Sequence, residues 1–288
     1  MRHACLDLYQ LGCESVLLKG GHLPRGPAND LFYDGSFRVF EGERLDKKVH
    51  GTGCMLSAFI TALVAKGVPV ADAVGLSKRF VTEAIRFSEP LGKGRSIGSP
   101  LTTLQNSAQR YHVLAEVFRW TGALEEVLPV ALIPETGANL AFALPFAASV
   151  DDVCSLDGRL ARAGKSARRV GFPAFGTPEP VASAVLAAMR SDRRVRSALN
   201  LRHSKPLLDL CRTLGLKIGE YDPAREPKDS ASTVEWGAGF AVRALGFVPD
   251  IISGEGAHGR EPMMLVLGEY PQQVVDKLGR IVTGLKER

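Results

Sequence analysis

Two short segments near the start of the chain have the composition of a phosphate-binding site. The first is Lys19-Gly20-Gly21-His22, at the end of an apolar run, and the second is Gly51-Thr52-Gly53-Cys54, just before another. A glycine-rich turn that leads into a helix leaves backbone N–H groups free, and the helix dipole makes them an anion site. Lys19 could contact phosphate oxygens, and Cys54 could act as a base because a helix start favours a thiolate. These residue types predict stabilisation of a phosphoryl group during its transfer.

A second group of candidates lies in the last third of the chain, where most members follow a predicted strand. Its cations and histidines are Arg202, His203, Lys205, Arg225, His258 and Arg260. Ser204 could cap the next helix and present its first N–H groups to a phosphate. Glu235 and Glu261 could orient the cations or bind an amino group of a ligand. The group predicts a site for phosphorylated small molecules, and the sequence identifies no metal ligands for it.

Each candidate also has a purely structural interpretation. A lone Gly-x-Gly occurs in many tight turns, and Arg225-Glu226 or Arg260-Glu261 can be a surface ion pair of little energetic weight. His203 can be a histidine with a structural role only. Residue type alone therefore leaves the individual roles open.

The overall composition is that of a globular protein with a modest positive charge. The 288 residues are 45% hydrophobic and 23% charged, with a net charge of +5 and a pI of about 9.0. This balance permits an anionic partner, but the sequence has no element typical of nucleic-acid readers, so a nucleic-acid partner is not expected. Five scattered cysteines without a Cys-x-x-Cys pair indicate neither a disulfide framework nor a zinc site. Without a signal-peptide pattern or a membrane-spanning apolar stretch, we expect a cytoplasmic protein with no membrane partner.

The first part of the chain predicts a small α/β segment. A strand is expected at 15–19, and two strands at 31–33 and 36–40 flank Asp34-Gly35, a strong hairpin signal. Helices are expected at 54–65 and 70–87. After them the large apolar residues become rare, and glycine, proline and hydroxyl residues increase, as in a linker. We therefore divide the chain into a segment at 1–90, a linker at 91–107 and a domain at 108–288.

The second part of the chain alternates predicted strands and helices. The expected strands are 131–134, 141–144, 198–201, 216–221, 251–253 and 263–267. The expected helices are 108–120, 177–190, 206–214, 233–245 and 272–285. Such alternation predicts a layered α/β domain. Periodicity does not decide whether its sheet is parallel or mixed.

The two glycine-rich segments together resemble the hydroxymethylpyrimidine (phosphate) kinase family of the ribokinase superfamily. That family ends a strand with Lys-Gly-Gly-His and builds its anion hole from Gly-Thr-Gly-Cys, and both patterns are present letter for letter. The resemblance covers 1–90 and implies an incomplete ribokinase-like segment in which Lys19 and Gly51-Thr52-Gly53 bind phosphate and Cys54 is the catalytic base. The family's chain is longer on its N-terminal side. The segment is therefore expected to be either a fragment or a vestige, to bind ATP only if the kinase is complete, and not to phosphorylate hydroxymethylpyrimidine by itself.

Residues 108–288 resemble, in the order and spacing of several phrases, the archaeal-type thiamine-phosphate synthase domain. The phrases lie at 133–139, 157–160, 200–204, 221–227, 233–237 and 254–263. The resemblance implies a separate α/β synthase domain that joins hydroxymethylpyrimidine diphosphate to thiazole phosphate with release of diphosphate, aided by Mg²⁺. Catalytic roles would fall to Arg202, Arg225 and His258. Substrate binding would fall to His203, Ser204, Lys205, Glu235, Arg260 and Glu261.

Two alternatives remain compatible with the same residues. Domains of this synthase type also serve as thiamine-phosphate sensors in transcription regulators, although no helix-turn-helix pattern is present here. A bifunctional kinase and synthase would require further kinase sequence upstream. The sequence is also compatible with a homo-oligomer.

Overall fold

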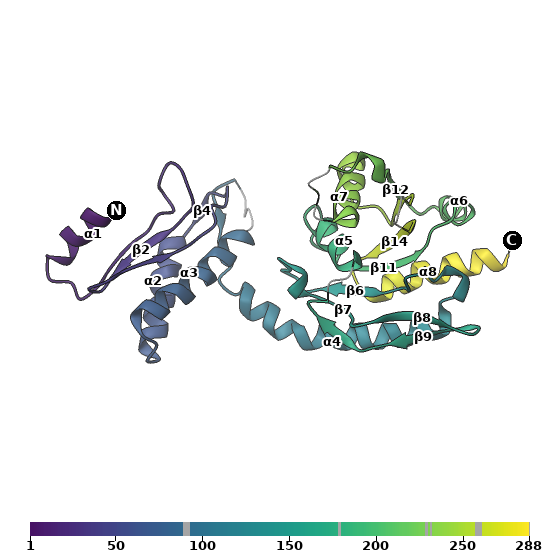
Figure 1. Ribbon diagram of the computed structural model, residues 1–288, viewed down its shortest axis with the longest axis horizontal. Coiled ribbons are helices and arrows are strands. Elements are labelled where there is room, and N and C mark those ends of the chain that lie inside the picture. Colours follow the sequence, from purple (N-terminus) through teal and green to yellow (C-terminus); the bar gives the residue numbers. More distant parts are fainter. Residues whose placement is uncertain (89–92, 178–179, 228–229, 231, 257–260, 288) are drawn as a thin grey trace. The chain divides into compact units, whose positions relative to one another are not determined.

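The chain forms two compact units, Met1–Gln105 and Asn106–Arg288. The computed structural model describes residues 1–88, 93–177, 180–227, 230, 232–256 and 261–287, drawn as ribbons in Figure 1. None of the helices in these described ranges is long and apolar enough to cross a lipid bilayer. Each unit has its own hydrophobic clusters.

The first unit combines a three-stranded antiparallel sheet with helices. Its strands, in spatial order, are β1 (Val16–Leu18), β2 (Asp30–Tyr33) and β3 (Phe37–Phe40). Its helices are α1 (Arg2–Tyr9), α2 (Thr52–Ala65) and α3 (Val70–Arg86), and β4 (Val49–His50) pairs in parallel with β5 (Ser96–Ile97). The predicted hairpin is confirmed, because Gly35 adopts a φ of +104° in the turn between β2 and β3.

A buried ion pair joins the sheet of the first unit to α3. The Lys78 Nζ lies 2.7 Å from a carboxylate oxygen of Asp30, with side chains only 11% and 8% exposed. The same ammonium donates to the Ala28 carbonyl, and the second Asp30 oxygen accepts from the Gly20 N–H at 2.9 Å. Because each polar atom has a partner, the pair can be tolerated in a buried position. It fixes the glycine turn that follows Lys19.

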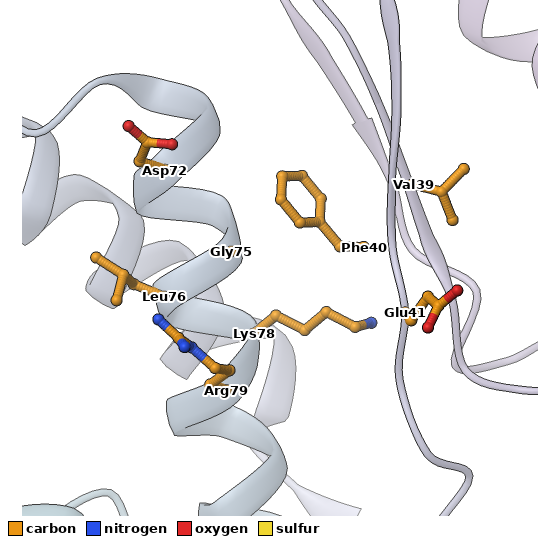
Figure 2. A pocket seen from close by; sticks show the side chains of 8 residues that line it. All are labelled: Val39, Phe40, Glu41, Asp72, Gly75, Leu76, Lys78 and Arg79. Atoms are coloured by element: carbon orange, nitrogen blue, oxygen red, sulfur yellow. The ribbon is translucent and has the colours of Figure 1, made fainter.

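A cavity of about 570 Å³ lies beside this ion pair, between β3 and α3. It is lined by Val39, Phe40, Glu41, Asp72, Gly75, Leu76, Lys78 and Arg79. Figure 2 shows Lys78 extending from the helix toward the strand segment that carries Glu41. The lining of this cavity does not include the site residues predicted for the first unit, Lys19 and Gly51-Thr52-Gly53-Cys54.

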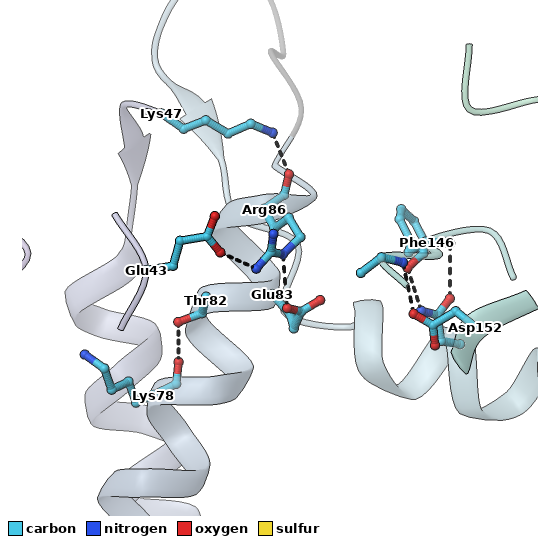
Figure 3. A network of polar contacts seen from close by, with 10 residues as sticks. Glu43, Lys47, Lys78, Thr82, Glu83, Arg86, Phe146 and Asp152 are labelled. Carbon is cyan, nitrogen blue, oxygen red and sulfur yellow. Dashed lines mark hydrogen bonds and ion pairs between the residues drawn. The ribbon is translucent and has the colours of Figure 1, made fainter. Parts of the chain in front are cut away.

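The C-terminal end of α3 is held by Arg86. Its guanidinium donates to Glu83 and Glu43, while its backbone carbonyl accepts from Lys47 (Figure 3). Burial alone would lower the pKa of Arg86, but the hydrogen bonds and charges of Glu43 and Glu83 raise it above its usual value. A positive charge at a helix C-terminus is also favourable to the helix dipole. These contacts anchor the end of the helix.

A seven-stranded mixed sheet forms the centre of the second unit. Its spatial order is β10-β7-β6-β11-β14-β13-β12, and only β12 and β13 pair in parallel. The strands are β6 (Leu140–Ala143), β7 (Val153–Leu156), β10 (Pro173–Phe175), β11 (Ser197–Arg202), β12 (Ile218–Tyr221), β13 (Ile251–Gly254) and β14 (Met263–Gly268). A separate hairpin is formed by β8 (Arg159–Ala163) and β9 (Ser166–Val170).

Helices cover both faces of this sheet. On one face α5 (Pro180–Met189) and α7 (Thr233–Leu245) pack in one buried cluster. On the other face α6 (Lys205–Thr213), α8 (Pro271–Lys286) and the end of α4 (Thr102–Val127) share a second cluster. Because β11 is apolar in both directions, with Ala198 in one cluster and Leu199 in the other, it is buried on both sides. The predicted α/β layer architecture is confirmed.

Sequence signals at the helix ends match the observed boundaries. Ser204 caps α6 by accepting from the Leu207 N–H, and Ser232 caps α7 by accepting from the Glu235 N–H. Gly246 ends α7 with a φ of +75°, a conformation that favours glycine. The helices predicted at 206–214, 233–245 and 272–285 are confirmed to within one or two residues.

The structure differs from the sequence-based prediction in three respects. The strand expected at 131–134 is wrong, because residues Val130–Leu132 form a short 3₁₀ helix between two prolines. Strands β7 to β10 were not predicted. Helix α4 starts at Thr102, six residues before the prediction, so the expected linker at 91–107 contains a strand and the first turn of a helix. The domain ranges proposed from the sequence remain a prediction.

The buried ion pair gives a test of what stabilises the first unit. We expect Asp30→Asn to destabilise this unit by about 3–5 kcal/mol, because Lys78 would keep a buried charge without its partner. The control Asp34→Asn removes an exposed pair with Arg38, at 3.3 Å, and should cost at most about 1 kcal/mol. Hydrogen exchange of the amides in β2 and α3 measures both effects. Equal protection in the two variants would contradict the prediction.

A second stability test concerns Asp250, which accepts from Lys277 at 2.7 Å and from the Lys217 N–H at 2.9 Å. Burial alone would raise the pKa of Asp250, but these hydrogen bonds lower it below its usual 3.8. The stabilisation is therefore present above pH 3.8 and is lost as the pH falls through the folded-state pKa. We expect Asp250→Asn to lower the free energy of unfolding by about 1–2 kcal/mol at neutral pH and to have little effect in acid. Urea unfolding over a pH series, with exposed Asp276→Asn as control, measures the difference.

Candidate functional site

Five segments of the second unit meet at one edge of its sheet. Because β11 runs antiparallel to both β6 and β14, and β13 is antiparallel to β14, the ends of β11, β12 and β13 lie beside the starts of β6 and β14. Most phrases singled out in the sequence therefore belong to this one edge. Two cavities open there.

The first cavity, which we call the asparagine cavity, has a volume of about 520 Å³. Its lining includes Thr136, Gly137, Asn139, Arg159, Asn200, Tyr221, Val234, Gly254, Glu255, Glu261 and Met263. The second, which we call the charged cavity, has a volume of about 470 Å³. Its lining includes His203, Lys205, Asp209, Arg212, Glu220, Tyr221, Asp222, Arg225, Phe240, Ser253 and Glu255. Tyr221 and Glu255 line both, so the cavities adjoin.

Two buried asparagines form the floor of the asparagine cavity. The Asn200 side chain accepts from the Asn139 N–H at 2.6 Å and donates to the Gly137 carbonyl at 3.1 Å. The Asn139 amide donates to the Leu156 carbonyl at 3.0 Å and accepts from the Leu156 N–H at 3.0 Å. These bonds connect the start of β6 with the ends of β7 and β11, at the point where the regular backbone pairing of the strands stops. The polar groups of both side chains are therefore satisfied by bonds within the protein.

Tyr221 is the wall between the two cavities. Tyr221 is only 8% exposed, and a Cβ at either Gly237 or Gly254 would overlap its ring. The ring also packs edge-on against Trp236, with centroids 6.2 Å apart. Glycine is needed at both positions because the ring lies against the backbone of α7 on one side and of β13 on the other. This packing fixes where each cavity ends.

Cations and carboxylates both line the charged cavity, but their pairing is uneven. Arg212 donates to Asp209 at 2.7 Å and to Glu220, and these partners raise its pKa above its usual value. By contrast, Lys205 lies 3.9 Å from Glu255, and Arg225 lies 3.8 Å from Asp222, with all four side chains more than half exposed. Such loose, hydrated pairs contribute little energy. Lys205 and Arg225 can therefore exchange their carboxylate partners for a ligand at small cost.

The structure brings together some of the predicted site residues but not all of them. His203, Lys205 and Arg225 line the charged cavity, and Glu261 lines the asparagine cavity. Ser204 caps α6, as proposed from the sequence. Arg202 is exposed at the end of β11, opposite Met263, outside both linings, and Glu235 pairs with Arg190 at 2.5 Å. His258 and Arg260 lie outside the described residues.

In the first unit the two glycine-rich motifs come together. Gly51 adopts a φ of +82° and precedes α2, so the first N–H groups of the helix follow directly. The Lys19 ammonium lies near Gly53, 3.1 Å from the position that a Cβ would take there. Cys54 is exposed on the first turn. The arrangement has the donors of an anion site, with a lysine beside a helix start.

Several lining residues were part of the quoted phrases but received no role from the sequence. Asn139, Asn200, Tyr221 and Arg159 are the main examples. Their only signal is position relative to the strands: Asn139 directly precedes β6, Asn200 lies within β11, Tyr221 ends β12 and Arg159 begins β8. Partners such as Asn139 and Asn200 are 61 residues apart and become visible only through the pairing of β6 with β11.

Comparison with known proteins identifies both parts of the chain. The model of the thiamine-phosphate synthase ThiN family matches residues 116–280, and the phosphomethylpyrimidine kinase model matches residues 1–99. The chain therefore belongs to the ThiN family and carries a partial kinase segment in front of it. A crystal structure of the C-terminal domain of phosphomethylpyrimidine kinase is 34% identical, with a TM-score of 0.57, and the match covers 60% of this chain and 99% of that one.

Two curated relatives match one or both of these parts. The bifunctional thiamine biosynthesis protein ThiDN of Methanocaldococcus jannaschii is 33% identical over 84% of this chain and 56% of its own length. The thiamine-phosphate synthase ThiN of Methanothermobacter thermautotrophicus is 29% identical over 54% of this chain and 84% of its own length. The chain thus spans a little over half of the bifunctional relative. The predicted resemblance to both families is confirmed.

The tight packing of Tyr221 gives a matched pair of substitutions. We expect Gly237→Ala, in α7, to destabilise the second unit by about 1–3 kcal/mol, because the added methyl must displace the Tyr221 ring. The control Gly279→Ala, in α8, has nothing within 4 Å of its new methyl. It should stabilise by about 0.5–1 kcal/mol. Thermal unfolding of both variants checks this, and a neutral Gly237→Ala would mean that the ring does not define the wall.

Proposed function

We propose that the second unit catalyses the thiamine-phosphate synthase reaction on hydroxymethylpyrimidine diphosphate and thiazole phosphate. The thiazole nitrogen forms a bond to the pyrimidine methylene carbon, the carbon–oxygen bond to diphosphate breaks, and its electron pair leaves with diphosphate. No net proton transfer is required. The protein must therefore align two rings and stabilise a departing anion.

The observation that carries this proposal is the pair of adjoining cavities within the span of the matched family model. One cavity is polar and neutral in its floor, and the other has cations that are only loosely paired. Two substrates that must meet need two compartments with a common boundary. Tyr221 and Glu255 line both compartments and mark that boundary.

In this proposal the charged cavity binds a phosphate group of a substrate. Lys205 and Arg225 would release Glu255 and Asp222 and bind phosphate oxygens, and His203 would donate a further hydrogen bond. The start of α6, capped by Ser204, adds a favourable dipole. Arg202 and His258, predicted from the sequence as cationic donors, remain proposed participants.

The expected Mg²⁺ fits the same cavity. A magnesium ion that binds a diphosphate needs only one or two carboxylates from the protein, and Asp222 and Glu255 both line this cavity. Among the described residues no group of three or more His, Cys, Asp or Glu could hold a metal by itself. We therefore propose that Asp222 and Glu255 hold the ion together with the substrate. Bound there, it would neutralise charge on the leaving diphosphate.

For the first unit we propose a kinase-type phosphate site at Lys19, Gly51-Thr52-Gly53 and Cys54. The closeness of the Lys19 ammonium to Gly53 supports it. In a polypeptide that contains a whole kinase, these residues would bind a phosphate of ATP, with Cys54 as the base. The chain covers 39% of the length of one such kinase, from Aquifex aeolicus.

The synthase proposal is tested by incubating the chain with Mg²⁺ and both substrates and oxidising the product to fluorescent thiochrome. We expect turnover, and a fall in kcat/KM of at least about tenfold in Lys205→Ala and in Arg225→Ala, because each removes a donor to a phosphate. Arg168→Ala, an exposed residue of β9, is the matched control and should retain full activity.

Absence of product in a folded protein would contradict the proposal. If thiamine phosphate then raised the melting temperature of the protein, the sensor alternative would replace it. Equal losses in Arg168→Ala and Arg225→Ala would show that general charge, and not the charged cavity, supports the reaction.

A further inference from the structure

The β-turn at the mouth of the asparagine cavity has two backbone donors that point at one carboxylate. The Gly137 N–H donates to the Pro134 carbonyl at 3.1 Å and closes the turn. The N–H groups of the two central residues, Glu135 and Thr136, are left outside that bond. Successive N–H groups of this kind form a concave anion-binding nest.

The carboxylate of Glu261 occupies this nest. Its oxygens accept from the Glu135 N–H at 2.7 Å, from the Thr136 N–H at 3.2 Å and from the Thr136 hydroxyl at 3.2 Å. Glu261 is 126 residues away in sequence, just before β14. The two oxygens of this carboxylate therefore accept from three donors. The oxygens of a phosphoryl group can be bound by a set of donors of the same kind.

Arginines on the opposite side hold the carbonyls of the same loop. Arg159 donates to the Thr136 carbonyl and Arg162 donates to the Ile133 carbonyl, both from strand β8. The carbonyl oxygens are therefore turned toward β8, whereas the N–H groups face Glu261. The Arg159 side chain lies directly on Gly137, where a Cβ would overlap it, and it lines the cavity as well. Its charge adds positive potential beside the nest.

We propose that the nest of Glu135 and Thr136 is a phosphoryl-binding subsite, and that Glu261 fills it until a phosphorylated ligand displaces its carboxylate. The inference rests on the proposed function, because it supplies the second of two phosphate sites that the two substrates require. Thr136 of the nest lines the asparagine cavity, Lys205 and Arg225 line the charged cavity, and Tyr221 lines both cavities. The subsite accepts either the diphosphate of one substrate or the phosphate of the other.

The test measures binding of inorganic diphosphate and, separately, of inorganic phosphate to the full chain by calorimetry. We expect Glu261→Gln to tighten binding of at least one anion about tenfold, because a charged competitor for the same donors is removed. The matched control is Glu135→Gln, which removes an equal charge from the adjacent exposed side chain and leaves the nest occupied. It should change the affinity by less than about twofold.

A second variant separates a binding role from a purely structural one. Thr136→Val removes the hydroxyl donor, and in the Glu261→Gln background it should reverse most of the gain. Tightening for diphosphate alone assigns the nest to the leaving group, and tightening for phosphate alone assigns it to thiazole phosphate. Unchanged or weaker binding of both anions in Glu261→Gln overturns the inference. Glu261 would then have only the structural role of holding the loop in place. The thiochrome assay reports separately on the proposed reaction, so failure of the subsite and failure of the synthase activity are distinguishable.

Discussion

The antiparallel pairing of β11 with β14 is the interaction on which the second unit depends. Six residues of each strand pair in register, from Ser197 with Gly268 to Arg202 with Met263. Both strands are buried in the centre of the sheet, so their backbone groups have no access to water and must pair with each other. Because β11 also pairs with β6 and β14 also pairs with β13, this pairing connects the two halves of the sheet. It also brings the segment before β14 to the edge where β11 ends.

The reversal of direction across this pair explains why one edge collects so many functional candidates. In an all-parallel sheet only the segments after strands would gather there. Here segments that precede β6 and β14 join those that follow β11, β12 and β13. Glu261 and Thr136 belong to the first kind, and Lys205 and Arg225 belong to the second. The donors therefore surround the two cavities from several directions.

The sequence predicted most of the fold but only part of the site. Helix α7, which has an apolar face and lies between Ser232 and Gly246, was predicted to the residue, and α6 and α8 were predicted to within one residue at each end. Strands β8 and β9 were missed because their arginine-rich sequences lack the alternation of a half-buried strand. The apolar run near Leu132 predicts a strand, but Pro129 before it favours the short 3₁₀ turn that the structure shows.

Cationic candidates were predictable because charge and position after a strand suffice to suggest them. The asparagine pair and the Tyr221 wall were not, since both result from contacts between residues far apart in sequence. Glu261 illustrates the limit best. Its type and place were noted, yet its binding to the turn at Glu135 and Thr136 depends on strand order alone.

A carboxylate that is tethered beside its own donors sets a threshold for any free anion. A group held by a short segment has an effective concentration in the millimolar range. Dilute, singly charged anions cannot compete with it, so the donors at Glu135 and Thr136 stay shielded from chloride and similar solutes. Multiply charged anions with several oxygens can. In the proposed subsite, the Glu261 contact would therefore favour multiply charged anions over singly charged ones.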